Sequence, residues 1–163
     1  MKHLILVRHA KSSWESGAAS DFERPLNDRG KRDAPMMAQR LRDKKINIDT
    51  FISSPAKRAK KTAIAFAEVY KKGKDDIIFK EALYGALPES FYEIISEIDD
   101  KSEIVAIFSH NPGITDFANE LTKATIDDLP TCGIFALSVK ADKWSDFRNA
   151  EKEFLFADYP KLV

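Results

Sequence analysis

The chain has 163 residues, enough for one domain of ordinary size with a substantial hydrophobic core. Its 26 Lys and Arg residues balance its 26 Asp and Glu residues, so no overall charge attracts nucleic acid or an acidic membrane surface. The single cysteine, Cys132, excludes an internal disulfide, and no apolar run approaches the ~18 residues of a membrane span. We therefore expect one globular domain over residues 1–163, located in the cytoplasm, with no nucleic-acid or membrane partner.

Apolar runs alternate with segments of helical periodicity along the chain. Strands are predicted at 3–8, 50–53, 76–80, 103–110, 133–139 and 151–157. Helices are predicted at 31–44, 56–72, 89–98 and 113–122. Pro35 is expected in the first turn of its helix, where the missing N–H does no harm. The order βαβαβαβαββ predicts an α/β three-layer sandwich, with helices on both faces of a mainly parallel central sheet.

Polar residues follow three of the predicted strands. The first strand ends in Arg-His at 8–9, the second in Ser-Ser-Pro at 53–55, and the fourth in Ser-His-Asn-Pro at 109–112. The carboxyl ends of parallel strands share one edge of the sheet, where α/β proteins bind ligands, so we expect these groups to meet. Arg58 lies about one helical turn beyond Pro55, within reach of the same edge. Such a cluster is cationic and rich in N–H donors, which suits a phosphoryl group.

The residue types also suit phosphoryl transfer. A neutral imidazole nitrogen can attack phosphorus, and an arginine fork matches two phosphoryl oxygens. A second, charged histidine can donate to an oxygen that gains negative charge in the transition state. Any one of these residues alone is more often an ordinary surface group, but three strands ending alike favour a shared site. His3 lies near the start of its strand and is given no role.

Five motifs resemble those of a known family. LVRHA at 6–10, SSPAKRAKKTA at 53–63 and HNPG at 110–113 resemble the signature of the histidine phosphatase superfamily. KSSW at 11–14 and DFERPLNDRG at 21–30 are similar to its small SixA-type branch of phosphohistidine phosphatases. The resemblance extends from residue 2 to about residue 140, and implies a phosphoglycerate mutase-like fold and phosphatase activity. No metal or other cofactor is expected, because two arginines and a charged histidine can neutralise the charge on the phosphoryl oxygens, and the sequence has no paired-carboxylate motif of the kind that binds magnesium.

The resemblance also implies the roles of particular residues. His9 is the expected nucleophile, Arg8 and Arg58 the expected ligands of the phosphoryl oxygens, and His110 the group that stabilises the transition state. Two further residues of the motifs are candidates for phosphate binding, Ser12 and Asn111.

One departure from the family bears on the substrate. Other branches place a glutamate in a Leu-x-Glu pattern after the third strand, where it protonates a leaving ester oxygen, but this chain has Leu83-Tyr84-Gly85. Imidazole, with a reference pKa of about 6.5, leaves far more easily than an alkoxide. The missing acid therefore favours phosphohistidine as substrate, unless another carboxylate supplies the proton; the candidates are Glu81, Glu89 and Asp21.

The expected partner is a protein carrying phosphohistidine, or else a small phosphorylated molecule, and phosphate or sulfate is expected to bind in the site. Three alternatives remain open: a phosphatase of small phosphate monoesters, a phosphoglycerate mutase, and a phosphate-binding module without turnover. The mutase is disfavoured because it needs an acid/base carboxylate and a closed pocket. The sequence does not indicate an oligomeric state.

Overall fold

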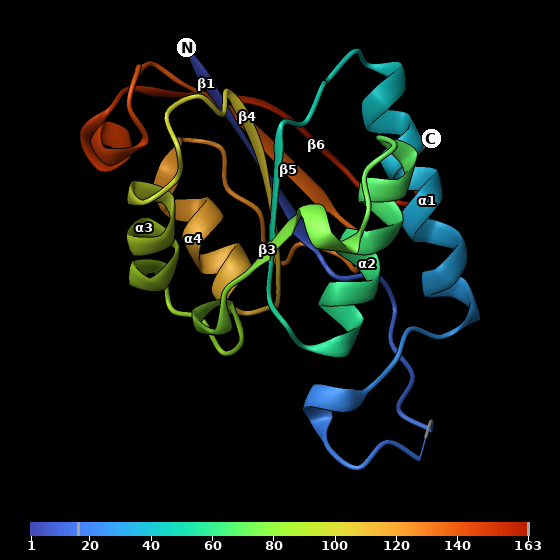
Figure 1. The fold of residues 1–163 in the computed structure, drawn as a ribbon. Coiled ribbons are helices and arrows are strands. Elements are labelled where there is room, and N and C mark those ends of the chain that lie inside the picture. The colour runs from blue at the N-terminus through green and yellow to red at the C-terminus, as the bar shows by residue number, and fades with distance from the viewer. Residues whose placement is uncertain (16, 163) are drawn as a thin grey trace.

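A computed structural model describes residues 1–15 and 17–162, and one six-stranded sheet runs through the centre of this part of the chain (Figure 1). Its strands are β1 (Lys2–Arg8), β2 (Thr50–Ser53), β3 (Ile77–Phe79), β4 (Ile104–Ser109), β5 (Ile134–Val139) and β6 (Lys152–Asp158). The order across the sheet is β3-β2-β4-β1-β5-β6. The first four strands in this order pair in parallel, whereas β5 pairs antiparallel with both β1 and β6. The prediction of a mainly parallel sheet is confirmed.

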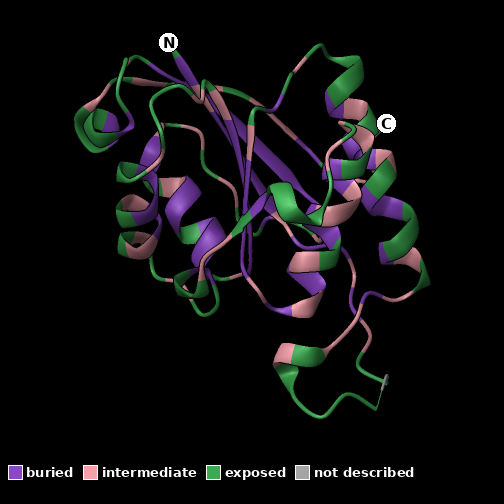
Figure 2. Cartoon of the chain, in the orientation of Figure 1, coloured by how far each residue is buried: buried purple, intermediate pink, exposed green. Residues whose placement is uncertain are grey.

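Helices cover both faces of the sheet, as the alternation of strands and helices predicts. The helices are α1 (Asp28–Asp43), α2 (Lys57–Val69), α3 (Pro88–Ser96) and α4 (Gly113–Leu121). Figure 1 shows α1 and α2 on one face and α3 and α4 on the other. Each face has its own hydrophobic core, and the strands between the two cores are buried (Figure 2). The apolar runs at the centre of the sheet, β1, β2, β4 and β5, are strands buried on both sides, whereas the edge strands β3 and β6 are partly exposed.

In the part of the chain that the structure describes, four short 3-10 helices join the main elements: η1 (Asp21–Glu23), η2 (Lys74–Asp76), η3 (Glu81–Leu83) and η4 (Trp144–Asn149). The last of these connects β5 to β6, where the sequence shows no clear helix. Residues 76–80 form a shorter strand than predicted, because η2 takes the first of them. No helix in the described residues is long and apolar enough to cross a membrane.

The predicted position of Pro35 is wrong. Helix α1 begins at Asp28, and the side chain of Asn27 caps it by accepting a hydrogen bond of 2.8 Å from the Gly30 N–H. Pro35 therefore lies inside the helix, where it cannot donate to the Lys31 carbonyl. Pro35 is exposed, so water can solvate that carbonyl, which reduces the penalty for an interior proline.

The carboxyl ends of the parallel strands share one edge of the sheet. Beyond this edge projects the segment between β1 and α1, which contains η1 (Figure 1). This edge carries most of the predicted site residues, and the projecting segment adds more.

Candidate active site

Strand pairing brings the two predicted site histidines together. Arg8 at the end of β1 lies opposite Ser109 at the end of β4, so His9 and His110 leave the sheet side by side. Their ring centroids are 5.1 Å apart, and the rings are tilted by 52°. Only 6% of His9 and 7% of His110 is exposed. Two adjacent strands thus hold a pair of imidazoles at the ligand-binding edge.

His9 is held in one tautomer. Its Nδ1 lies 2.8 Å from the Ala10 carbonyl oxygen, which can only accept a hydrogen bond, so Nδ1 carries the proton and Nε2 keeps a lone pair. The His9 main chain is anchored on both sides, because its N–H donates to Ser109 and its carbonyl accepts from Cys132. Burial lowers the pKa of His9 to about 3, and the nearby positive groups act in the same direction. The imidazole is therefore neutral near pH 7, as a nucleophile must be.

His110 makes one hydrogen bond and has one unpaired nitrogen. Its Nε2 lies 2.8 Å from the Ser54 hydroxyl oxygen, while its buried Nδ1 has no hydrogen-bond partner. The ring of Tyr84 packs edge-on against it, with centroids 5.5 Å apart. Burial, followed by the charge of Arg58, lowers the pKa of His110 to about 4. The sequence predicts a charged His110, whereas burial keeps this imidazole neutral near pH 7 in the protein by itself. A phosphoryl dianion beside the ring would raise the pKa of His110.

Arg8 presents a partly unsatisfied guanidinium at the same edge. Its Nη1 donates to the Leu129 carbonyl oxygen at 2.9 Å and lies 3.9 Å from the Asp128 carboxylate. Its Nε is buried without a partner. Buried polar groups almost always have a hydrogen-bond partner, so unpaired nitrogens on both Arg8 and His110 indicate a site that takes a polar ligand.

Arg58 reaches the site from the first turn of α2 and is already paired. Its Nη1 donates to the main-chain oxygen of Asp21 at 2.8 Å, and its Nη2 donates to the carboxylate of Asp21 at 3.0 Å. Asp21 is the first residue of η1, in the projecting segment, and its side chain is 47% exposed. The projecting segment is thus tied to the basic cluster through this ion pair.

Three donors converge on Asp21. The Tyr84 hydroxyl donates to its carboxylate at 2.7 Å, and Arg24 does so at 2.9 Å. Together with Arg58 they hold the pKa of the Asp21 carboxyl well below its usual range, and Tyr84 makes the largest contribution. Of the three candidate acids, Asp21 is therefore the one beside the basic cluster, but it is ionised near neutral pH and has no proton to give.

The other two candidate acids are placed differently. Glu89, at the start of α3, forms an ion pair with Arg148 of η4. Glu81 opens η3 and is exposed, and its side chain makes no hydrogen bond or ion pair with a described residue. Neither is held against the histidines in this structure.

The two additional phosphate-binding candidates have partners within the protein. The hydroxyl of Ser12 accepts a hydrogen bond from Arg24, whose guanidinium also stacks on the Trp14 ring at 3.3 Å. The side-chain amide of Asn111 donates to Asp128 and to the Leu129 carbonyl, and its oxygen accepts from the Thr115 hydroxyl. In this arrangement both side chains brace the loops around the histidines, and neither amide hydrogen of Asn111 is left for a ligand.

Several residues of this network were not among the predicted site residues, and Thr62 and Tyr84 are two examples. Thr62 accepts a hydrogen bond from the Ala10 N–H at 2.9 Å and donates to the Arg58 carbonyl at 2.7 Å, so it links the end of β1 to helix α2. Thr62 is a fixed position of the motif at 53–63, so the motif could have indicated that this residue belongs to the site. Tyr84 carries no comparable signal, because its contacts to Asp21 and His110 depend on how distant loops fold together.

Comparison with known proteins identifies the family of the chain. A family model described as the histidine phosphatase superfamily (branch 1) matches residues 4–105. The chain belongs to this superfamily. An uncharacterized protein of Mycobacterium tuberculosis is 31% identical to this superfamily member over 150 residues, covering 86% of this chain and 90% of the relative. The family predicted from the motifs is confirmed, and membership supports phosphatase activity.

Solved structures share the fold of this histidine phosphatase superfamily member. SixA from Agrobacterium tumefaciens superposes with a TM-score of 0.81 at 23% identity, covering 98% of each chain. A protein histidine phosphatase SixA in complex with tungstate gives a TM-score of 0.76 at 21% identity, with 96% of each chain covered. The predicted phosphoglycerate mutase-like fold of the SixA type agrees with both.

Proposed function

We propose that this protein is a phosphohistidine phosphatase that passes the phosphoryl group of a phosphorylated protein through His9. The observation that carries the proposal is the pair of neutral imidazoles flanked by Arg8 and Arg58, in which His9 is fixed with Nε2 unprotonated. A nucleophile, a second imidazole and two cations are what a covalent phosphoryl transfer needs.

In the first step, Nε2 of His9 attacks phosphorus, and the P–N bond to the substrate imidazole breaks as the new P–N bond forms. The guanidinium groups of Arg8 and Arg58 stabilise the negative charge on the phosphoryl oxygens. His110 donates an N–H to one of these oxygens. In the second step, water attacks phosphorus and the P–N bond to His9 breaks, which restores the lone pair on Nε2. The hydroxyl of the water stays on the inorganic phosphate, and its other proton passes to a phosphate oxygen or to solvent.

The placement of the carboxylates favours a nitrogen leaving group over an ester oxygen. A substrate imidazole, with a reference pKa of about 6.5, can take a proton from water on its other nitrogen and leave neutral. An alkoxide needs a positioned acid, whereas Asp21 is ionised among three donors and Glu89 is paired with Arg148. This supports a phosphoramidate substrate.

The test compares phosphohistidine with phosphate monoesters and looks for the covalent intermediate. Purified protein is assayed on free phosphohistidine, a phosphohistidine peptide, phosphoserine and p-nitrophenyl phosphate, and radiolabelled phosphoryl groups are trapped by rapid denaturation in alkali. We expect the largest kcat/KM on phosphohistidine, label on His9, and a fall of about 10³-fold or more in kcat in both His9→Ala and His110→Ala.

Faster cleavage of the monoesters would replace this function with that of a small-molecule phosphatase. Binding of phosphate without turnover of any substrate would indicate a phosphate-binding module. Turnover that persists in His9→Ala would exclude the covalent mechanism.

A further inference from the structure

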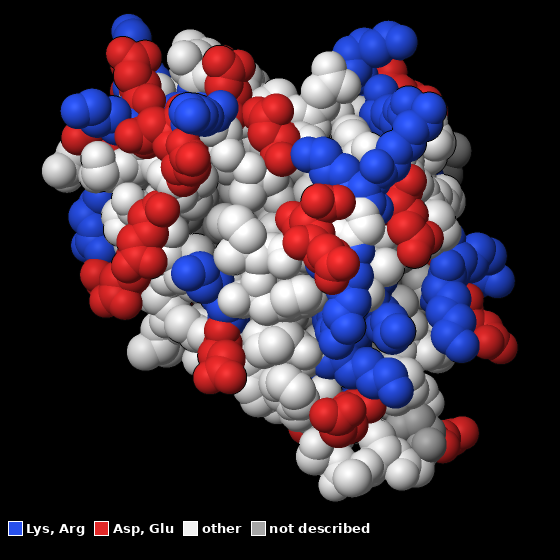
Figure 3. Space-filling view, in the orientation of Figure 1, with Lys and Arg blue, Asp and Glu red and all other residues white. Residues whose placement is uncertain are grey.

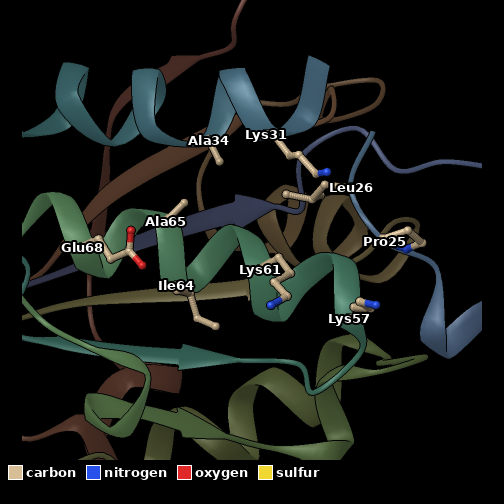
Figure 4. Close-up of a pocket in the computed structure, with 9 residues that line it drawn as sticks. All are labelled: Pro25, Leu26, Lys31, Ala34, Lys57, Lys61, Ile64, Ala65 and Glu68. Carbon is tan, nitrogen blue, oxygen red and sulfur yellow. The ribbon is translucent and has the colours of Figure 1, made fainter. Parts of the chain in front are cut away.

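A pocket of about 520 Å³ lies between α1 and α2, outside the cluster of histidines and arginines (Figure 4). Its apolar lining includes Leu26, Ile64 and Ala65, and its polar lining includes Lys31, Lys57 and Lys61. We call it the α1–α2 groove. The α2 residues that line it lie at positions 57, 61, 64, 65 and 68, a spacing that places them on one face of the helix.

The groove has an unbalanced positive charge at one end. None of the three lysines forms an ion pair with another described residue, although the chain as a whole has equal numbers of acidic and basic groups. Glu68 is the one acidic lining residue, and it lies at the far end of the groove, about 16 Å from Lys57 along the helix axis. Basic side chains gather over the first half of α2 in Figure 3.

The positive end of the groove adjoins the candidate active site. Lys57 directly precedes Arg58, and Leu26 forms a bridge with Ser12 of the segment that follows His9. A molecule that presents a phosphoryl group to His9 therefore has the lysines within reach of its flanking residues. The lining of the groove along α2, from Lys57 to Glu68, is about 16 Å long in all and accommodates about five residues of extended peptide.

We propose that the α1–α2 groove binds an acidic segment of the phosphorylated protein substrate, with carboxylates on the lysines and an apolar side chain against Leu26, Ile64 and Ala65. This inference rests on the proposed function and deepens it, because it names the feature of the substrate that the enzyme selects. Unpaired lysines beside an apolar floor match a segment that alternates acidic and apolar residues. A small phosphorylated molecule held at His9 does not extend into the groove.

Two phosphohistidine peptides test the inference, one with Glu and Leu on both sides of the phosphohistidine and one with Gln in place of every Glu. Free phosphohistidine serves as the substrate that lacks flanking residues. We expect the wild-type enzyme to favour the acidic peptide by about tenfold in kcat/KM, and added salt to weaken this preference. In Lys31→Glu/Lys61→Glu we expect the preference to disappear, while kcat/KM on free phosphohistidine stays within about twofold.

The control reverses two charges at the opposite edge of the sheet. Lys101 and Lys143 are exposed, and Lys101 lies shortly before the first residue of β4. Lys101→Glu/Lys143→Glu changes the net charge equally and should retain the preference for the acidic peptide. Binding of the unphosphorylated acidic peptide, measured by calorimetry, should weaken only in the groove variant.

The outcomes separate this inference from the proposed function. Equal kcat/KM on the two peptides, or a preference that survives in the groove variant, would overturn the docking site while leaving phosphohistidine hydrolysis intact. A wild-type enzyme that hydrolyses neither free phosphohistidine nor the peptides overturns the proposed function, and the docking of a phosphohistidine substrate with it.

Discussion

The ion pair between Arg58 and Asp21 places an ionised carboxylate beside a guanidinium that we propose to bind a phosphoryl group. Two guanidinium nitrogens of Arg58 donate to Asp21, one to its main-chain oxygen and one to its carboxylate. A phosphoryl dianion that binds Arg58 therefore lies near an ionised carboxylate, which repels it. This repulsion weakens the binding of substrate and of product phosphate alike, and so assists release of the product.

Removing the Asp21 charge tests this balance. In Asp21→Asn, the one amide oxygen can still accept hydrogen bonds from Tyr84 and Arg58, which both donate to the same oxygen of Asp21. The hydrogen bond from Arg24, which goes to the other oxygen, is lost, and the side chain no longer repels the anion. We expect the inhibition constant of inorganic phosphate to fall about fivefold, with kcat on phosphohistidine within about threefold of wild type. Steady-state kinetics with added phosphate measures both quantities.

Glu23 provides the matched control, because it lies two residues away in the same 3-10 helix and its side chain makes no hydrogen bond or ion pair with a described residue. Glu23→Gln removes the same charge and should change the inhibition constant much less. A hundredfold loss of kcat in Asp21→Asn, with phosphate inhibition unchanged, would instead identify Asp21 as a proton donor.

Individual elements differ in how far the sequence alone predicts them. β1 and β4 are predictable because each is a short apolar run that ends in polar residues, and their parallel pairing places His9 beside His110. The interior position of Pro35 was not predictable from the preference of proline for first turns, since the Asn27 cap sets where α1 begins. The contacts of Tyr84 depend on two loops that are distant in sequence, and no local pattern encodes them.

The packing of α4 against the loop before α3 depends on a single glycine. A Cβ atom added at Gly113 would lie 2.2 Å from the main-chain oxygen of Ala86, so helix and loop could not approach as closely as they do. Gly113 opens the helix that follows His110, and displacement of α4 would also displace that imidazole.

We therefore expect Gly113→Ala to lower the free energy of unfolding by about 2 kcal/mol or more and to reduce kcat as well. Gly73→Ala is the control, because a Cβ there meets no atom within 4 Å and the backbone φ is −111°. It should change the free energy of unfolding by less than about 0.5 kcal/mol. Urea denaturation measures the free energy of unfolding of both variants. Equal values would show that the loop containing Ala86 can move away from α4 without loss of stability.

At the scale of the whole molecule, the site places two imidazoles where neither is readily protonated. The sheet separates two hydrophobic cores, and the histidines lie at the end of its central strands, buried by elements from both sides. Burial of this kind favours the neutral form of a histidine. The fold thus keeps both imidazoles neutral near pH 7, and it does so at the expense of stability in acid.

The depressed pKa values of the two buried histidines predict how the free energy of unfolding depends on pH. The pKa values of His9 and His110, about 3 and about 4 in the folded protein, lie below the ~6.5 of an exposed histidine. Between these values the unfolded chain binds more protons than the folded one, so the free energy of unfolding decreases as pH falls below 6.5. The decrease is at most about 1.4 kcal/mol per pH unit for each histidine. Protonation of Asp21 lowers the free energy of unfolding further only below about pH 4, the ordinary pKa of a carboxyl group, because the pKa of Asp21 is also depressed in the folded protein.

Urea denaturation of wild type and His9→Gln/His110→Gln at pH 7, 6 and 5 measures this effect. Glutamine cannot be protonated, so the double variant should lose less stability than wild type across this range, and each single variant should fall between the two. The test compares how steeply the free energy of unfolding changes with pH in each protein. The absolute stabilities are not compared, because glutamine also alters packing. Equal slopes in wild type and the double variant would mean that the two imidazoles are protonated in the folded protein as readily as in the unfolded chain, and that the site does not keep His9 neutral by burial.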